Sequence, residues 1–182
     1  MRTDRLQKEY GVELLLRVFP LHPETPDAGT ELSKLFAGRE AMIAEMQTRL
    51  ARVAAAEGLP LALRSRTYNS RRAQELGKWA ESRGKGNAFH RSVYHAYFVE
   101  GVNIALIDEL VALSESVGLS ADEARRVLLT GSFAPAVDAD WHRARELRIT
   151  EVPTHLCGGK RLAGFGPYND FLSLIACETP HA

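Results

Sequence analysis

Cysteine is scarce in this sequence. Its 182 residues include only two, Cys157 and Cys177, which stand far apart along the chain. Two cysteines are too few for a disulfide framework, and their separation excludes a Cys-x-x-Cys redox motif or a zinc knuckle built from the pair. We therefore expect two buried or half-buried free thiols, while a bridge between them stays open until their distance is known.

Net charge and long apolar runs are missing as well. Lys plus Arg and Asp plus Glu both number 23, so the formal net charge is zero. A neutral protein has no overall field that gathers nucleic acid or anionic membrane. No apolar run approaches the ~20 residues of a membrane helix, and the opening MRTDRLQKEY lacks the apolar core of a secretory signal. We predict a cytoplasmic protein with neither nucleic acid nor membrane as partner.

One segment departs from this balance. Between Arg64 and Lys85, seven basic residues face only two acidic ones, Glu75 and Glu81. A solvated basic face is the interpretation we favour, and attraction of a small anionic ligand is the alternative.

The N-terminal part of the chain predicts a helix followed by a strand. Residues 2–10 are typical of a short helix or the end of a longer one. Val12–Phe19 places branched apolar residues at every second position, which is the period of a strand. The prolines at positions 20, 23 and 26 then predict an irregular loop, because proline neither donates to a ladder nor fits inside a helix.

Residues 31–147 read as a helical block. Apolar side chains recur there at three- and four-residue spacing, which predicts amphipathic helices. The clearest stripes are Met42, Met46, Leu50 and Val53; Leu76 and Trp79; Phe89, Val93 and Tyr97; and Ile107, Leu110 and Val111. Asn69 or Ser70 can cap the second helix, and Ser120 with Glu123 forms a capping box for a later one. A last helix is expected over residues 134–147.

The C-terminal part changes character again. Residues 154–157 and 160–163 predict two short strands joined by Gly158-Gly159, which suits a hairpin turn. Gly166-Pro167 then opens a closing helix. The order predicts an α/β protein, in which the long helical block is an insertion between the first strand and the hairpin.

Several long segments, taken in order, resemble one known family. They are FPLHPETP (19–26), YNSRRAQELGKWAE (68–81), FHRSVYHAYFVEG (89–101), VDADWHRARELRITEVPT (137–154) and GGKRLAGFGPY (158–168). With them the sequence resembles the DsbA-type thioredoxin-like proteins, most closely the FrnE-like branch of dithiol–disulfide oxidoreductases or isomerases. The resemblance covers nearly the whole chain.

The resemblance implies a particular architecture. Residues 1–30 and 148–182 are expected to form the thioredoxin-like part, and residues 31–147 the inserted all-α domain. It also implies that Pro153 is cis and that the Val152 backbone is presented to an extended peptide or to a thiol-containing ligand.

The sequence departs from this family in one respect. The family begins with a strand, and a Cys-x-x-Cys follows it at the start of the first helix. The N-terminus of that helix lowers the pKa of a cysteine. Here residues 1–10 correspond to the second half of that helix, so the redox centre is absent. Either the start codon is assigned too far downstream, which we favour, or the redox centre was lost. Without the central strand, we expect Val12–Phe19 to pair with the strand after Pro153, or a second chain to fill the gap as a homodimer.

Five residues are candidates for substrate binding: Val152, Pro153, His22, Asn69 and Gly166. His22 lies in the proline-rich loop, and Asn69 is a helix cap that some thioredoxin-like relatives place near their substrate. Gly166 precedes the last helix, whose free N–H groups suit a carboxylate; in glutathione-using relatives a site resembling this one holds glutathione.

No histidine has companions at metal-ligand spacing, so no metal site is predicted. No cofactor is expected, with glutathione as the open alternative. The expected activity is thiol–disulfide exchange with a thiol- or disulfide-bearing protein or small molecule. The alternatives are a glutathione-dependent isomerase or transferase and a non-catalytic thiol- or peptide-binding module.

Overall fold

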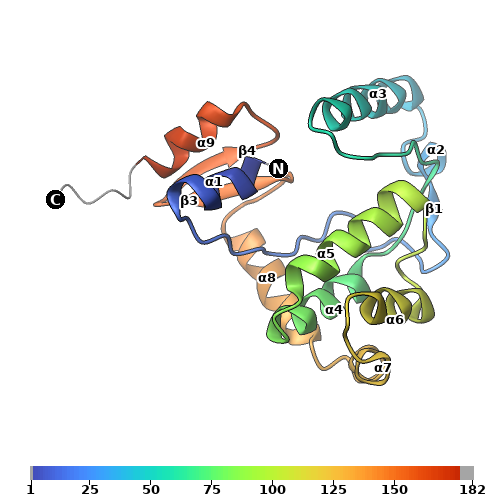
Figure 1. Cartoon of the computed structure of the whole chain (residues 1–182). Helices are drawn as coiled ribbons and strands as arrows, with labels where there is room; N and C mark the ends of the chain where they lie inside the picture. The colour runs from blue at the N-terminus through green and yellow to red at the C-terminus, as the bar shows by residue number, and fades with distance from the viewer. Residues whose placement is uncertain (1, 177–182) are drawn as a thin grey trace. The chain divides into compact units, whose positions relative to one another are not determined.

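The computed structural model describes residues 2–176, so Cys177 lies outside the described residues. The chain forms two compact units (Figure 1). We call Pro20–Ala139 the helical unit, and Met1–Phe19 together with Asp140–Ala182 the hairpin unit.

The described elements are mostly helical, with few strands. In chain order they are α1 (Arg2–Tyr10), β1 (Thr30–Glu31), α2 (Leu32–Leu35), α3 (Glu40–Ala56), β2 (Arg66–Thr67), α4 (Arg71–Ser82), α5 (Gly86–His95), the π-helical turn η1 (Ala96–Glu100), α6 (Ile107–Ser116), α7 (Ala121–Thr130), α8 (Ala134–Glu146), β3 (Thr154–Cys157), β4 (Lys160–Ala163) and α9 (Tyr168–Ile175). None of the described helices combines the length and the apolar character needed to cross a bilayer.

The core of the helical unit lies between α4, α5, α6 and α7. Helix α4 packs against the other three, as Figure 1 shows. Leu76, Trp79, Phe89 and Leu110 are almost completely buried there. This confirms the predicted apolar stripes of these helices. The predicted cap of α7 is present too, because Ser120 Oγ accepts a hydrogen bond from the Glu123 N–H at 3.3 Å.

Helix α3 forms where the sequence predicts it, but with a different buried face. Met42, Met46 and Leu50 are about half exposed, whereas Ile43 and Ala54 are buried. Periodicity identified the helix correctly because spacing alone determines that signal. Periodicity cannot show whether another element covers an apolar stripe. Among the described residues, no element buries the stripe of Met42, Met46 and Leu50.

The hairpin unit is built on β3 and β4, which pair antiparallel with His155 opposite Leu162. Gly158 and Gly159 join the strands with φ of 53° and 78°, a region that favours glycine. Helix α9 packs on both strands and α1 packs on α9 (Figure 1). The predicted hairpin and the two flanking helices are confirmed.

The predicted strand at Val12–Phe19 is wrong. These residues follow α1 as extended chain without regular strand structure, and β3 pairs only with β4 among the described residues. The expected pairing of Val12–Phe19 with the strand after Pro153 is therefore also wrong. A strand needs a neighbour to accept its hydrogen bonds, and alternating apolar residues do not supply one. The segment instead leaves Leu15 66% exposed.

Candidate functional site

The loop before β3 carries the two residues that the sequence singled out most strongly. The Val152–Pro153 peptide bond is cis. The Pro153 carbonyl accepts a hydrogen bond from the Gly164 N–H at 2.8 Å, which fastens this loop to the end of β4. The Thr154 hydroxyl donates to the Glu151 carbonyl at 2.7 Å and closes the turn from the other side. Val152 is 46% exposed, so its backbone and side chain are accessible.

Strand β3 lies beside this loop at one side of a sheet of two described strands. One edge bonds to β4, and no described strand lies on the other. A free strand edge binds extended polypeptide through its backbone N–H and C=O groups. Leu156 and Phe165 are also substantially exposed in this unit, so apolar contacts are available as well.

Gly166 lies at the start of α9, as expected, but that helix start is already occupied by side chains. Arg2 donates to the Gly166 carbonyl, and its guanidinium stacks 4.0 Å from the ring centre of Phe165. A Cβ at Gly166 would lie 2.7 Å from Asp170 Oδ2. The Asp170 carboxylate therefore sits at the N-terminus of α9, where it would repel the carboxylate of a ligand.

His22 lies in the proline-rich loop of the helical unit, and Asn69 hydrogen-bonds to that loop. The Asn69 side-chain amide donates to the Pro23 and Thr25 carbonyls at 3.0 and 2.7 Å, while its Oδ1 accepts from the Arg71 N–H at 2.8 Å. Asn69 thus bonds to the first N–H of α4, whose N-cap is Ser70, and holds the proline-rich loop. His22 is exposed and contacts the Phe36 ring edge-on. Asn69 therefore holds the loop through hydrogen bonds within the chain, and His22 is accessible on that loop.

Cys157 ends β3 and is half-buried. It is the single cysteine among residues 2–176, so this range holds no thiol pair. His155, two residues earlier, has a buried Nδ1 without a hydrogen-bond partner and packs edge-on against Phe171. Burial lowers the pKa of His155 from its ordinary value. The described residues contain no cluster of His, Cys, Asp or Glu that could hold a metal ion.

Asp140, which the sequence analysis did not select, fixes the extended segment after α1. Its carboxylate is 4% exposed and accepts from Arg17 Nη1 at 3.0 Å and from the Val18 N–H at 3.1 Å. Charge-assisted bonds of this kind are the stronger ones in proteins. They join residues far apart in sequence, and local spacing gives no signal for them.

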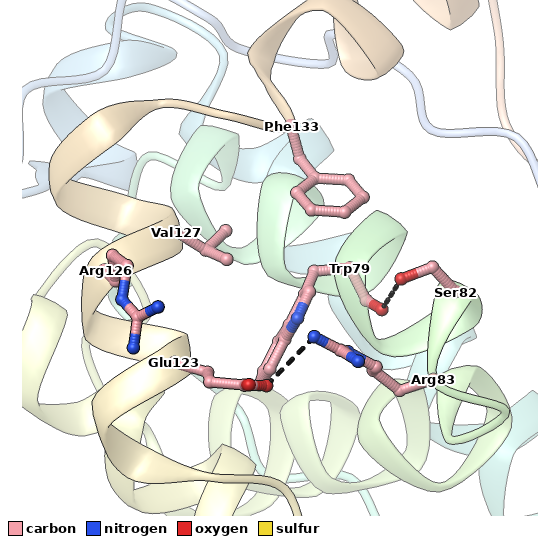
Figure 2. A pocket seen from close by; sticks show the side chains of 7 residues that line it. All are labelled: Trp79, Ser82, Arg83, Glu123, Arg126, Val127 and Phe133. Carbon is pink, nitrogen blue, oxygen red and sulfur yellow. Dashed lines mark hydrogen bonds and ion pairs between the residues drawn. The ribbon is translucent and has the colours of Figure 1, made fainter.

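Two of the pockets among the described residues lie in the helical unit. The first has a volume of about 200 Å³, and Figure 2 shows the Trp79 ring at its centre with Arg83 and Arg126 on opposite sides. Its polar groups largely satisfy one another. Arg83 pairs with Glu123 at 3.1 Å, and the Ser82 hydroxyl donates to the Trp79 carbonyl at 2.6 Å. The second pocket lies where the chain segment before β2 meets η1.

Comparisons with known proteins agree with this architecture. The family model described as a DSBA-like thioredoxin domain matches residues 1–176. A probable DsbA oxidoreductase of Streptomyces coelicolor has a similar structure, with a TM-score of 0.86, 24% identity and coverage of 100% of this chain and 85% of that one. A 2-hydroxychromene-2-carboxylate isomerase has a TM-score of 0.71 at 22% identity, over 95% of this chain and 83% of that one.

One relative is similar in sequence. The uncharacterised protein YwbO of Bacillus subtilis is 32% identical over 101 residues, which is 55% of this chain and 50% of YwbO. The match thus spans about half the length of that relative.

Proposed function

The chain belongs to the DSBA-like thioredoxin domain family, and on that premise we propose that it serves thiol–disulfide exchange by binding an extended, cysteine-bearing polypeptide. The observation that supports this most directly is the exposed Val152 in the loop before β3. A bound peptide would contact Val152 with the residues next to its substrate cysteine. FrnE-like dithiol–disulfide exchange is the activity that we assign to this recognition surface.

The exchange itself requires two further thiols. A thiolate attacks one sulfur of the substrate disulfide and releases the other as a thiolate, and a second thiol then resolves the mixed disulfide. The printed sequence holds no Cys-x-x-Cys. The role proposed for these residues is therefore recognition, and the reacting pair has to come from another polypeptide segment.

A glutathione-dependent isomerase is the second candidate, and the similarity of fold to the 2-hydroxychromene-2-carboxylate isomerase is the reason to consider it. The start of α9 argues against it. The Asp170 carboxylate lies beside Gly166, where a glutathione carboxylate was expected to bind.

Peptide binding tests the recognition role without needing catalysis. A short peptide with one disulfide is titrated into the labelled chain while amide NMR shifts are followed. We expect shifts in β3 and around Val152, and about tenfold weaker binding in Val152→Asp, because a charge replaces an exposed apolar contact. Leu129→Asp is the matched control, since Leu129 is exposed on α7 in the helical unit. Equal binding by both variants would refute the β3 site.

Insulin reduction by dithiothreitol then tests the chemistry. The chain as printed is expected to give no acceleration, whereas a chain extended upstream by a strand and a Cys-x-x-Cys is expected to accelerate the reaction. Acceleration by the unextended chain would show that Cys157 or Cys177 is itself reactive.

A further inference from the structure

The second pocket of the helical unit is formed by the segment before β2 and by η1. Its volume is about 260 Å³, and its walls include Arg64, Tyr68, Tyr97, Phe98 and Glu100. The Ala62 N–H donates to the Phe98 carbonyl at 2.8 Å, which joins the two walls. The volume lies just below the ~300–1,000 Å³ range of small-molecule pockets. The pocket therefore fits a small ligand.

Arg64 is a half-buried cation without a counter-ion in this pocket. Its guanidinium stacks 4.5 Å from the ring centre of Tyr97 and 5.1 Å from that of Phe98. Its Nη1 is buried and has no hydrogen-bond partner in the described structure. Burial lowers the pKa of Arg64 from its ordinary value, which reflects the cost of desolvating this charge.

The neighbouring arginines differ from Arg64. Arg66 donates two hydrogen bonds to Glu31 at 2.5 and 3.1 Å, and Arg72 pairs with Asp27 at 2.6 Å. Arg71 pairs with both Glu75 and Asp138, at 2.8 and 2.6 Å. Carboxylates thus neutralise most of the basic residues between Arg64 and Lys85. This segment is therefore neither a wholly solvated basic face nor a general anion-binding surface. Arg64 is the desolvated member that the described residues leave without an acid.

The backbone at the pocket has an uncommon conformation. Tyr97, Phe98 and Glu100 all lie on η1, a π-helical turn. Such turns are rare and occur frequently at functional sites. The Tyr97 hydroxyl is within 2.9 Å of Thr67 Oγ1, so the ring beneath Arg64 is fixed in place. The Tyr97 ring and the Arg64 guanidinium that stacks on it therefore have defined positions.

The one carboxylate in the pocket wall sets a limit on the ligand charge. Glu100 lies 3.2 Å from His95 Nδ1 and is about half exposed. It would repel a doubly charged group such as phosphate more strongly than a single carboxylate. One unpaired guanidinium also matches one carboxylate in charge and in planar, two-pronged geometry.

We propose that this pocket binds a small organic carboxylate with an apolar body, whose carboxylate pairs with Arg64 while its body lies against the aromatic wall. The pairing removes the cost of the uncompensated guanidinium, and the apolar body covers Tyr68 and Phe98. Nothing in this proposal depends on thiol exchange, because all of its residues lie in the helical unit.

Calorimetry and amide NMR with benzoate test the proposal. We expect saturable binding, with shifts at Arg64, Tyr97 and Gly101, and at least tenfold weaker binding in Arg64→Met. Arg126→Met is the matched control, since Arg126 is an exposed arginine on the rim of the first pocket, and it should bind benzoate like the wild type. Equal weakening in both variants, or none in Arg64→Met, would overturn the assignment.

Two further probes use the unaltered chain, so they hold even if a variant folds poorly. Benzamide has nearly the shape of benzoate without its charge and should bind at least tenfold more weakly. Inorganic phosphate should compete poorly with benzoate. Equal binding of benzamide would show an apolar pocket without charge recognition, and strong binding of phosphate would show a general anion site; either result refutes the proposed carboxylate specificity.

Discussion

The helical unit and the hairpin unit bury their side chains to different degrees. In the helical unit, Leu76 and Leu110 have no exposed surface and Phe89 has 1%. In the described part of the hairpin unit, the best buried apolar side chains, Leu6 and Phe171, keep 5% and 4%. The hairpin unit also exposes Leu15, Val152 and Phe165. The helical unit also exposes apolar side chains, such as Leu63 and Leu129, so the two units differ in how completely their cores are buried.

The largest effect is expected from a cavity in the helical core. Leu110→Ala removes a completely buried side chain between packed helices and should lower the free energy of unfolding by about 3–5 kcal/mol. Urea unfolding followed by circular dichroism measures this. Leu129→Ala on neighbouring α7, where the side chain is 69% exposed, should change it by less than about 0.5 kcal/mol. Similar losses in the two variants would contradict a core confined to the inner faces of these helices.

A matched truncation in the hairpin unit should cost less. Leu174→Ala on α9 should lower stability by about 2 kcal/mol, because its site is shallower and can relax into the space left. Hydrogen exchange locates the effect: amides of β3 and β4 should exchange faster while those of α4 and α6 keep their protection. If α4 and α6 lose protection equally, the two units unfold as one and the comparison fails.

A buried charge within the hairpin unit holds the extended segment in place. Asp140→Asn weakens the bonds that its carboxylate accepts from Arg17 and from the Val18 N–H, at a cost of about 1 kcal/mol. In Asp140→Asn, the amides of Val12–Phe19 are expected to exchange faster, with little change in α4. Asp138→Asn is the control, because Asp138 is an exposed partner of Arg71 in the helical unit. Unchanged exchange at Val18 in Asp140→Asn would show that other contacts hold the segment.

The sequence predicted local features well and long-range ones poorly. The hairpin residues, the cap at Ser120 and the bond from Asn69 to the start of α4 depend on neighbours a few positions away, and the structure has all three. The strand at Val12–Phe19 failed because strand formation requires a partner that spacing cannot supply. Of the five predicted site residues, Val152 is accessible beside an open strand edge, while Asn69 is engaged in three hydrogen bonds within the chain.

The stacking of Arg64 on Tyr97 and Phe98 lay beyond sequence reasoning for a related reason. The sequence shows the cluster of basic residues between Arg64 and Lys85. Only the ion pairs of the folded chain show that Arg64 stacks on aromatic rings without an acid partner. Acids from α8 and from the loop after the prolines neutralise Arg71 and Arg72, and these acids are distant in sequence. Aromatic spacing on α5 and η1 predicted core packing, which holds for Phe89 and for Tyr97; the Tyr97 ring also stacks with the Arg64 guanidinium.

The smallest effect tests whether His155 adds a pH-dependent weakness to the hairpin unit. Because burial lowers its pKa in the folded chain, the unfolded chain binds the proton more readily as pH falls below about 6.5. The contribution to stability is therefore complete above that pH and is lost as the pH falls toward the folded-state pKa. His155→Phe keeps the contact with the Phe171 ring and removes the titration, so its unfolding free energy should decline less between pH 7.5 and 5 than that of the wild type. Urea midpoints across this range measure the difference. If His155→Phe shows the wild-type slope, the buried imidazole does not distinguish the two units, and their difference lies in packing alone.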